Sequence, residues 1–126
     1  MAMSHSTPPI LEDRDLTSEE AALIEWMLFH GTSDAQHFVP QLSRARVYSR
    51  CPYGCASIDL SVDGKRPTDF RMRVLGDFQW QNATGSLFGA FVFEPDGLLA
   101  GLDMWSVDGK ETPRHLPSPE HLSAYG

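Results

Sequence analysis

The chain lacks long apolar runs, and it has only two cysteines among its 126 residues. Its most apolar stretch, AALIEWMLF, is interrupted by Glu25 and is far shorter than the roughly 20 residues of a bilayer-spanning helix. No basic region followed by an apolar block occurs near the N-terminus, so no secretory signal is predicted. We therefore expect a cytoplasmic protein with no membrane contact, whose cysteines remain reduced thiols.

The common catalytic fingerprints are also missing. The sequence contains no Gly-rich phosphate loop ending in Lys-Ser or Lys-Thr, no dinucleotide fingerprint, no His-Glu-x-x-His and no Gly-x-Ser-x-Gly. The His-x-Glu and Pro-Cys-x-x-Cys pair of zinc deaminases is absent as well. The sequence thus predicts no catalytic residue and no cofactor, and a non-catalytic role is favoured.

Positive charge is scarce outside the middle of the chain. The formal net charge is −7, with −5 in residues 1–25, +3 in residues 26–76 and −5 in residues 77–126. An acidic protein repels nucleic acid and anionic lipid, so direct binding to either is disfavoured. A basic protein partner is favoured instead.

Length and composition, with 41% hydrophobic residues, predict one globular domain. Residues 1–15 are predicted to be a flexible tail, and residues 16–126 a single α+β domain with a Pro-rich C-terminal end. Thr17 and Glu20 form a capping-box pattern at the start of a helix, and Gly31 is expected to end it in a left-handed conformation. A shorter second helix is predicted from Ser33 toward Leu42.

From Ala45 onward the hydrophobic period changes from helical to alternating. The segments RVYS, SIDLSV, FRMRVL, SLFGAFVF and LLAGLDMWSV read as half-buried strands, because apolar residues recur at every second position. Their other faces are polar, which indicates an antiparallel sheet with one solvated side. The predicted fold is therefore two N-terminal helices followed by an antiparallel sheet of about five strands.

The segment CPYGC, residues 51–55, has three interpretations. A zinc site needs about four ligands, and only Cys51 and Cys55 form a close pair, with no paired histidines to complete it. A reactive thiol pair favours Cys-x-x-Cys at a helix N-terminus, whereas here three residues separate the cysteines and a strand follows. The favoured interpretation is a turn at Pro52 and Gly54 with the thiols as small apolar groups and no bound metal.

Three segments carry a resemblance: LTSEEAALIEWML, HGTSDAQHFVPQL and RVYSRCPYGCASIDL. In this order they resemble a set of small, largely uncharacterised bacterial proteins that have a cysteine-rich CxCGC-like segment before a strand. The resemblance spans roughly residues 11–62. Tyr53 stands where a third cysteine is expected, which argues against a metal site, and the resemblance implies no activity and no site residues.

One candidate surface follows from strand alternation in the acidic C-terminal half. In LDMWSV, Trp105 falls on the same strand face as Asp103. A tryptophan beside carboxylates is typical of anchors in protein interfaces. The predicted partner-binding residues are Asp77, Glu94, Asp96, Asp103 and Trp105.

Two functions from different classes remain. The favoured one is a non-catalytic immunity protein, which inhibits a basic, nucleic-acid-targeting bacterial toxin by filling its positive cleft. The alternative is a small enzyme or ligand-binding domain with a site between sheet and helices, using Asp59, Asp69 or His37 as acid or base.

Overall fold

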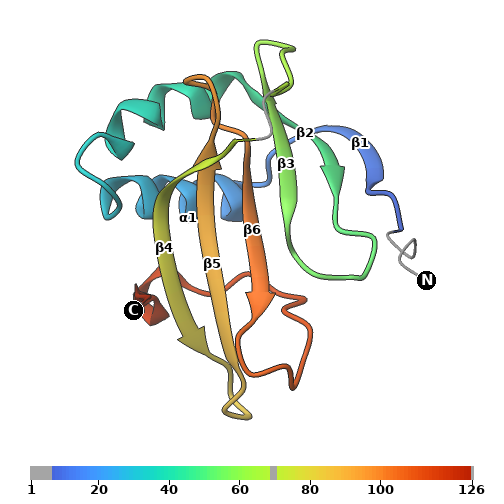
Figure 1. Cartoon of the computed structure of the whole chain (residues 1–126), viewed down its shortest axis with the longest axis vertical. Helices are drawn as coiled ribbons and strands as arrows, with labels where there is room; N and C mark the ends of the chain where they lie inside the picture. Colours follow the sequence, from blue (N-terminus) through green and yellow to red (C-terminus); the bar gives the residue numbers. More distant parts are fainter. Residues whose placement is uncertain (1–6, 69–70, 126) are drawn as a thin grey trace.

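The computed structural model describes residues 7–68 and 71–125. It has an antiparallel sheet of seven strands in the order β1-β2-β3-β6-β5-β4-β7, with α1 and the 3₁₀ helix η1 beside it (Figure 1). The strands are β1 Ile10–Asp15, β2 Ala45–Arg50, β3 Ile58–Val62, β4 Arg73–Gln81, β5 Leu87–Glu94, β6 Gly101–Ser106 and β7 Ser123–Ala124; the helices are α1 Ser18–Phe29, η1 Ala35–Arg44 and η2 Pro119–His121. The α+β class and antiparallel pairing are confirmed, while about five strands was too few because β1 and β7 were missed.

Helix α1 begins as its sequence predicted. Thr17 is the N-cap, its hydroxyl accepts a hydrogen bond from the Glu20 N–H at 3.0 Å, and the Glu20 carboxylate accepts one from the Thr17 N–H at 2.8 Å. The buried stripe of Leu23, Ile24 and Met27 continues to Leu28 and faces the sheet. In the part of the chain that the structure describes, no helix has the length and apolar character needed to cross a membrane.

Gly31 follows α1 for a different reason from the predicted one. The C-cap is His30, and Gly31 does not adopt a positive φ. A Cβ at Gly31 would overlap the carbonyl oxygen of Leu75 on β4, and the next residue, Thr32, donates its N–H to that oxygen at 2.8 Å. Gly31 is therefore required by close backbone approach rather than by a left-handed turn.

The segment predicted to be the end of a flexible tail is strand β1. It pairs with β2, and a β-bulge between Leu11 and Arg14 turns Arg14 toward α1. The Arg14 guanidinium binds the two carboxylate oxygens of the buried Glu20 at 2.9 and 3.1 Å, and it also binds Glu12. This bidentate pair holds β1 against the start of α1, so the prediction of a tail is wrong for residues 10–15.

The two faces of the sheet have different surroundings. Helix α1 passes behind β4, β5 and β6 in Figure 1, and apolar side chains from these strands fill the space between. Phe78 and Trp80 point to this buried side, whereas Asp77 and Gln79 point away, because successive side chains of a strand point to opposite faces. We call the side of β4, β5, β6 and β7 that faces away from α1 the open face.

Strands β3 and β6 pair over a short length. Only two residue pairs join these strands, Ile58 with Leu102 and Asp59 with Gly101. Beyond these two pairs, the Ser57 hydroxyl replaces a backbone hydrogen bond between the strands by accepting one from the Met104 N–H at 2.8 Å. Ser57 therefore sits at the junction between β1-β2-β3 and the rest of the sheet.

We predict that Gly31→Ala lowers the free energy of unfolding by about 1–3 kcal/mol, because the new methyl group displaces β4 from the end of α1. Chemical denaturation measures the effect. Ser33→Ala, an exposed change in the same connection, is the control and should remain within about 0.5 kcal/mol of the wild type. Equal stability of Gly31→Ala and the wild type would contradict the close contact.

The ion pair of Arg14 makes stability depend on pH. Burial raises the pKa of Glu20, but the hydrogen bonds from Arg14 and Thr17 outweigh burial and lower it. The carboxylate form therefore stabilises the fold above the ordinary glutamate pKa, and this contribution is lost as pH falls through the lowered pKa.

Arg14→Ala should accordingly lower the free energy of unfolding by about 1–3 kcal/mol at neutral pH. The difference from the wild type should shrink in acid, where Glu20 is protonated in both proteins. Arg46→Ala is the matched control, since Arg46 pairs only with the exposed Asp13 and Asp15 and should cost less than about 1 kcal/mol. A pH-independent loss in Arg14→Ala would show that packing, and not charge, holds β1.

Candidate functional site

Strand register gathers three of the predicted partner-binding residues on the open face. Asp77, Phe91 and Asp103 are adjacent across β4, β5 and β6, and the neighbouring row holds Gln79, Gly89 and Trp105. Asp77 and Trp105 are exposed and Asp103 is half-buried. The prediction that Trp105 shares a strand face with Asp103 is thus confirmed.

Aromatic side chains cover the backbone of this face where two strands carry glycine. The Trp105 indole lies over Gly89, where a Cβ would collide with it, and the Phe93 ring covers Gly101 in the same way. Trp105 also meets Tyr125 edge to face, with ring centroids 5.5 Å apart, although the indole remains 36% exposed. The result is a flat, partly exposed aromatic surface of the kind found at the centre of protein interfaces.

The carboxylates beside these rings are partly removed from water. Burial raises the pKa of Asp103, and the nearby Asp59 carboxylate raises it further, against the hydrogen bond donated by Ser57 at 2.9 Å. Burial also raises the pKa of Asp77. Asp59 itself accepts a hydrogen bond from the Ser49 hydroxyl at 2.7 Å. Among the described residues no cation forms an ion pair with Asp77 or Asp103, so these acids and Asp59 give this part of the sheet a negative character.

The structure does not bring Glu94 and Asp96 to this surface. Glu94 is buried, pairs with Arg73 at 2.9 Å, and accepts the Gly97 N–H at 2.8 Å. Asp96 lies in the turn after β5 with a φ of 55°. Arg73 also binds Asp34, which lowers the pKa of Asp34 to about 2. Glu94 therefore stabilises a turn and an ion-pair network, and its charge is already compensated.

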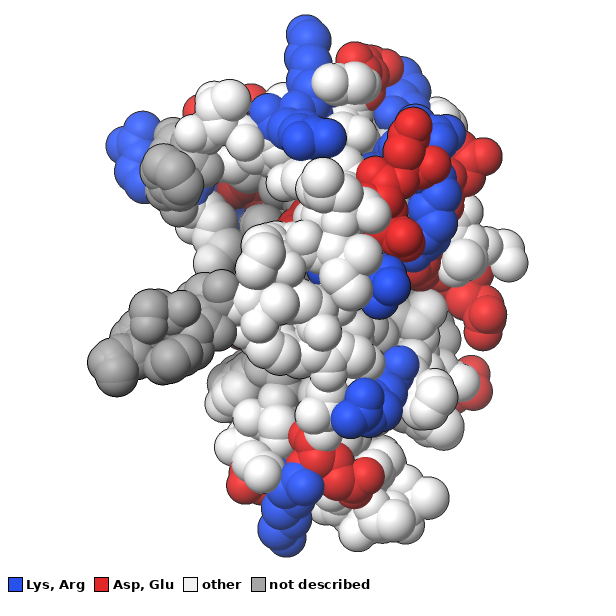
Figure 2. All heavy atoms as spheres, turned by 90° about the vertical axis from the view of Figure 1, so that its right-hand side faces the viewer, with Lys and Arg blue, Asp and Glu red and all other residues white. Residues whose placement is uncertain are grey.

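The acids of β1 are also compensated. Figure 2 shows basic and acidic side chains intermingled on the side of the molecule that it presents. On this edge Arg46 pairs with Asp13 at 3.0 Å and with Asp15 at 2.7 Å, and Arg50 approaches Glu12 at 3.6 Å. The strongly negative N-terminal sequence thus gives a mixed surface rather than an acidic one.

The residues considered for an acid–base site do not meet. Asp59 lies on the open side of β3, and His37 is an exposed residue of η1. Asp69 lies outside the described residues. The described part of the chain therefore forms no site from Asp59 and His37 between sheet and helices.

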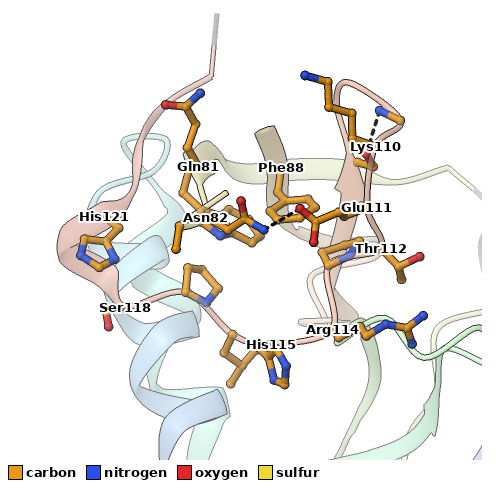
Figure 3. A pocket seen from close by; sticks show the side chains of 17 residues that line it. Gln81, Asn82, Phe88, Lys110, Glu111, Thr112, Arg114, His115, Ser118 and His121 are labelled. Carbon is orange, nitrogen blue, oxygen red and sulfur yellow. Dashed lines mark hydrogen bonds between the residues drawn. The ribbon is translucent and has the colours of Figure 1, made fainter. Parts of the chain in front are cut away.

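A cavity of about 1370 Å³ lies at the end of β4 and the start of β5, under the segment that follows β6. Trp80 and Phe88 are among its lining residues, and Figure 3 shows Asn82 and Glu111 directed toward each other across it. Glu111 accepts hydrogen bonds from Ser86, Thr84 and Asn82, which lower its pKa to about 2. Glu111 therefore stays negatively charged and holds the segment after β6 in place through these hydrogen bonds. Its pKa is far from that of a general acid or base at neutral pH.

Cys51 and Cys55 form a disulfide, with their Cα atoms 5.7 Å apart, so the prediction of free thiols is wrong. Pro52 and Gly54 form a tight turn, with Gly54 at a φ of 85°, and this turn brings the two cysteines close enough to bond. Neither sulfur is available as a thiolate ligand while the bond is intact. No group of three or more potential metal ligands occurs in residues 7–68 and 71–125.

Sequence reasoning missed two contributors to the open face, Tyr125 and Ser57. Tyr125 reaches it because β7 pairs with β4 and the Tyr125 N–H binds the Asp77 carbonyl at 3.1 Å. The two residues of β7 are too few to show a period. Ser57 is the first residue of the predicted strand SIDLSV, but its role depends on the distant Met104 and carries no local signal.

Comparison with family models, curated proteins and solved structures finds no match for this chain.

We predict that replacing both Cys51 and Cys55 by serine lowers the free energy of unfolding by about 2 kcal/mol, the chain-entropy value for a loop of this length, without preventing folding. Thermal or chemical denaturation should give the same stability for the double variant and for wild type held in reductant. Thiol alkylation of the denatured, unreduced wild type is the direct check, and two modified cysteines per chain would contradict the disulfide.

Proposed function

We propose that this chain is a non-catalytic, acidic binding protein whose open face occupies the cleft of a basic protein. The most concrete form is an immunity protein that neutralises a nucleic-acid-targeting bacterial toxin in the cytoplasm. The observation that carries the proposal is the exposed Trp105 on a flat aromatic surface bordered by Asp77 and Asp103.

Charge supports a basic occupant over an acidic or neutral one. Asp77 is exposed, Asp103 is half-buried, and the raised pKa of each shows that its charge is poorly solvated. A cationic partner would relieve the repulsion between Asp103 and Asp59, so binding gains attraction that the free protein lacks. A toxin that binds phosphate backbones offers such a cationic cleft.

Shape supports an interface with an apolar centre. Trp105 and Tyr125 are 36% and 39% exposed, and Val74 on β4 is 36% exposed. Large exposed apolar side chains that gather on one sheet face mark interaction surfaces more often than isolated ones do. An aromatic centre with an acidic border matches the arrangement of interface hot spots.

The cavity near Glu111 favours a second function, the binding of a small ligand. Its volume of about 1370 Å³ is ample for one, and Trp80, Phe88 and Leu116 give it apolar walls. This alternative predicts a ligand-induced rise in the melting temperature that Phe88→Ala abolishes and Trp105→Ala does not.

The test of the favoured function starts from a basic protein that co-purifies with the chain from its native host, whose nuclease activity is then assayed with and without the chain. Inhibition should weaken in Trp105→Ala by about 2–4 kcal/mol of binding free energy, mainly through faster dissociation. Phe29→Ala removes another exposed aromatic, 55% exposed at the end of α1, and should leave inhibition intact.

Charge reversal supplies a second test with equal net charge in both variants. Asp77→Lys on the open face should slow association and reduce its salt dependence, while Glu25→Lys on the exposed side of α1 should not. Both variants should fold as the wild type does. Equal effects of the two reversals, or loss of folding in Trp105→Ala, would remove the open face as the binding site.

A further inference from the structure

The disulfide loop borders a small cavity that three arginines and two glutamates help to line. The cavity measures about 390 Å³, and its lining includes Cys55, Ser57, Arg14, Arg50 and Arg114, together with Glu19 and Glu20. Arg14 and Arg50 are engaged by Glu12 and Glu20, but Arg114 makes no ion pair with any residue that the structure describes. Arg114 instead lies against Gly54, where a Cβ would collide with its guanidinium. A free guanidinium therefore flanks the disulfide in a protein that is acidic as a whole.

The Ser57 hydroxyl connects this cavity to Asp103. Its oxygen lies 3.4 Å from the Cys55 sulfur, donates its proton to Asp103 Oδ1 at 2.9 Å, and accepts the Met104 N–H at 2.8 Å. One lone pair of the hydroxyl remains to accept a further hydrogen bond. A thiol that enters the cavity can donate its proton to this lone pair while its sulfur faces Cys55.

We propose that Cys51–Cys55 is a thiol–disulfide exchange site for a small anionic thiol, in which Asp103 acts through Ser57 as the proton acceptor. Ser57 and Cys55 touch the reacting atoms, whereas Asp103 is a positioning and proton-accepting group behind them. This inference does not depend on the proposed binding function.

The reaction balances without a further cofactor. The incoming thiol gives its proton to Ser57, which passes its own proton to Asp103, and the thiolate attacks the Cys55 sulfur. A new S–S bond forms to Cys55, the Cys51–Cys55 bond breaks, and Cys51 leaves as a thiolate that takes a proton from water. A second thiol molecule then attacks the mixed disulfide, so two small thiols are oxidised to their disulfide as the protein is reduced to a dithiol.

The surroundings of the disulfide provide the positive charge and the base that the sequence of the loop itself lacks. The spacing of the cysteines and the following strand argued against a redox pair, because no helix N-terminus lies behind them to stabilise a thiolate. Arg114 supplies positive charge to the cavity, and Asp103 supplies a base. Asp59 on β3 favours the protonation of Asp103, and Asp77 on β4 is the other acid of this row, separated from Asp103 by Phe91.

Selectivity for negative thiols is the first test, using reduction of the oxidised full chain by glutathione and by the cationic thiol cysteamine. Each rate is divided by the rate of the same thiol with a small uncharged disulfide. The corrected rate for glutathione should exceed that for cysteamine by about tenfold, and Arg114→Ala should remove the difference. Lys110→Ala, an exposed cation outside this cavity, should keep it. Equal corrected rates in the wild type would overturn the anionic-thiol assignment.

The second test separates proton transfer from structure. Asp103→Asn retains an acceptor for Ser57 but not a base, so reduction near neutral pH should slow by about tenfold, since only a few per cent of a small thiol is ionised there. The deficit should vanish at alkaline pH, where the thiol ionises without help. A deficit of equal size at every pH, or none, would overturn the relay. Circular dichroism of this variant and of Ser57→Ala confirms that the compared proteins are folded.

Discussion

Close packing between the end of α1 and the start of β4 determines which side of the sheet is available for binding. A Cβ on Gly31 would overlap the Leu75 carbonyl, and a Cβ on Gly76 would lie 2.9 Å from the Met27 carbonyl. Two glycines thus allow two backbones to meet with almost nothing between them. Because α1 lies this close, its apolar stripe buries Phe78 and Trp80, and the alternate residues of the same strands are left on the open face. Trp105 is exposed because α1 covers the opposite side of the sheet.

Local pattern was sufficient for the central part of the fold. The capping box of Thr17 and Glu20 and the alternation in β3, β5 and β6 are short-range signals, and all appear in the structure. Strand β1 was missed because ILEDRD reads as a charged tail until Arg14 reaches Glu20. The disulfide was missed because compartment chemistry was given more weight than a turn that brings two sulfurs together.

The candidate site was predictable only in part. Alternation along a strand shows which side chains share a face, but it does not show which charges are compensated by an ion pair. Alternation along β6 placed Trp105 and Asp103 together, and the register across β5 brings Asp77, which was selected for its charge, onto the same face. Counting charges in the C-terminal half also selected Glu94, since its partner Arg73 lies 21 residues earlier in the chain. Net charge of a segment therefore gave the sign of the surface but not the residues that bear its free charge.

The edges of the sheet have a consequence for how this molecule can associate. At one end β1 carries four consecutive charged residues, 12–15, and a β-bulge; at the other, β7 is two residues long. Such edges offer few regularly spaced N–H and C=O groups, and they resist the strand-to-strand joining that leads to fibrils. An exposed aromatic sheet face with long, regular edge strands would favour aggregation of that kind. Because its borders are blunted, association of this sheet with another molecule is restricted to contacts through side chains rather than through backbone.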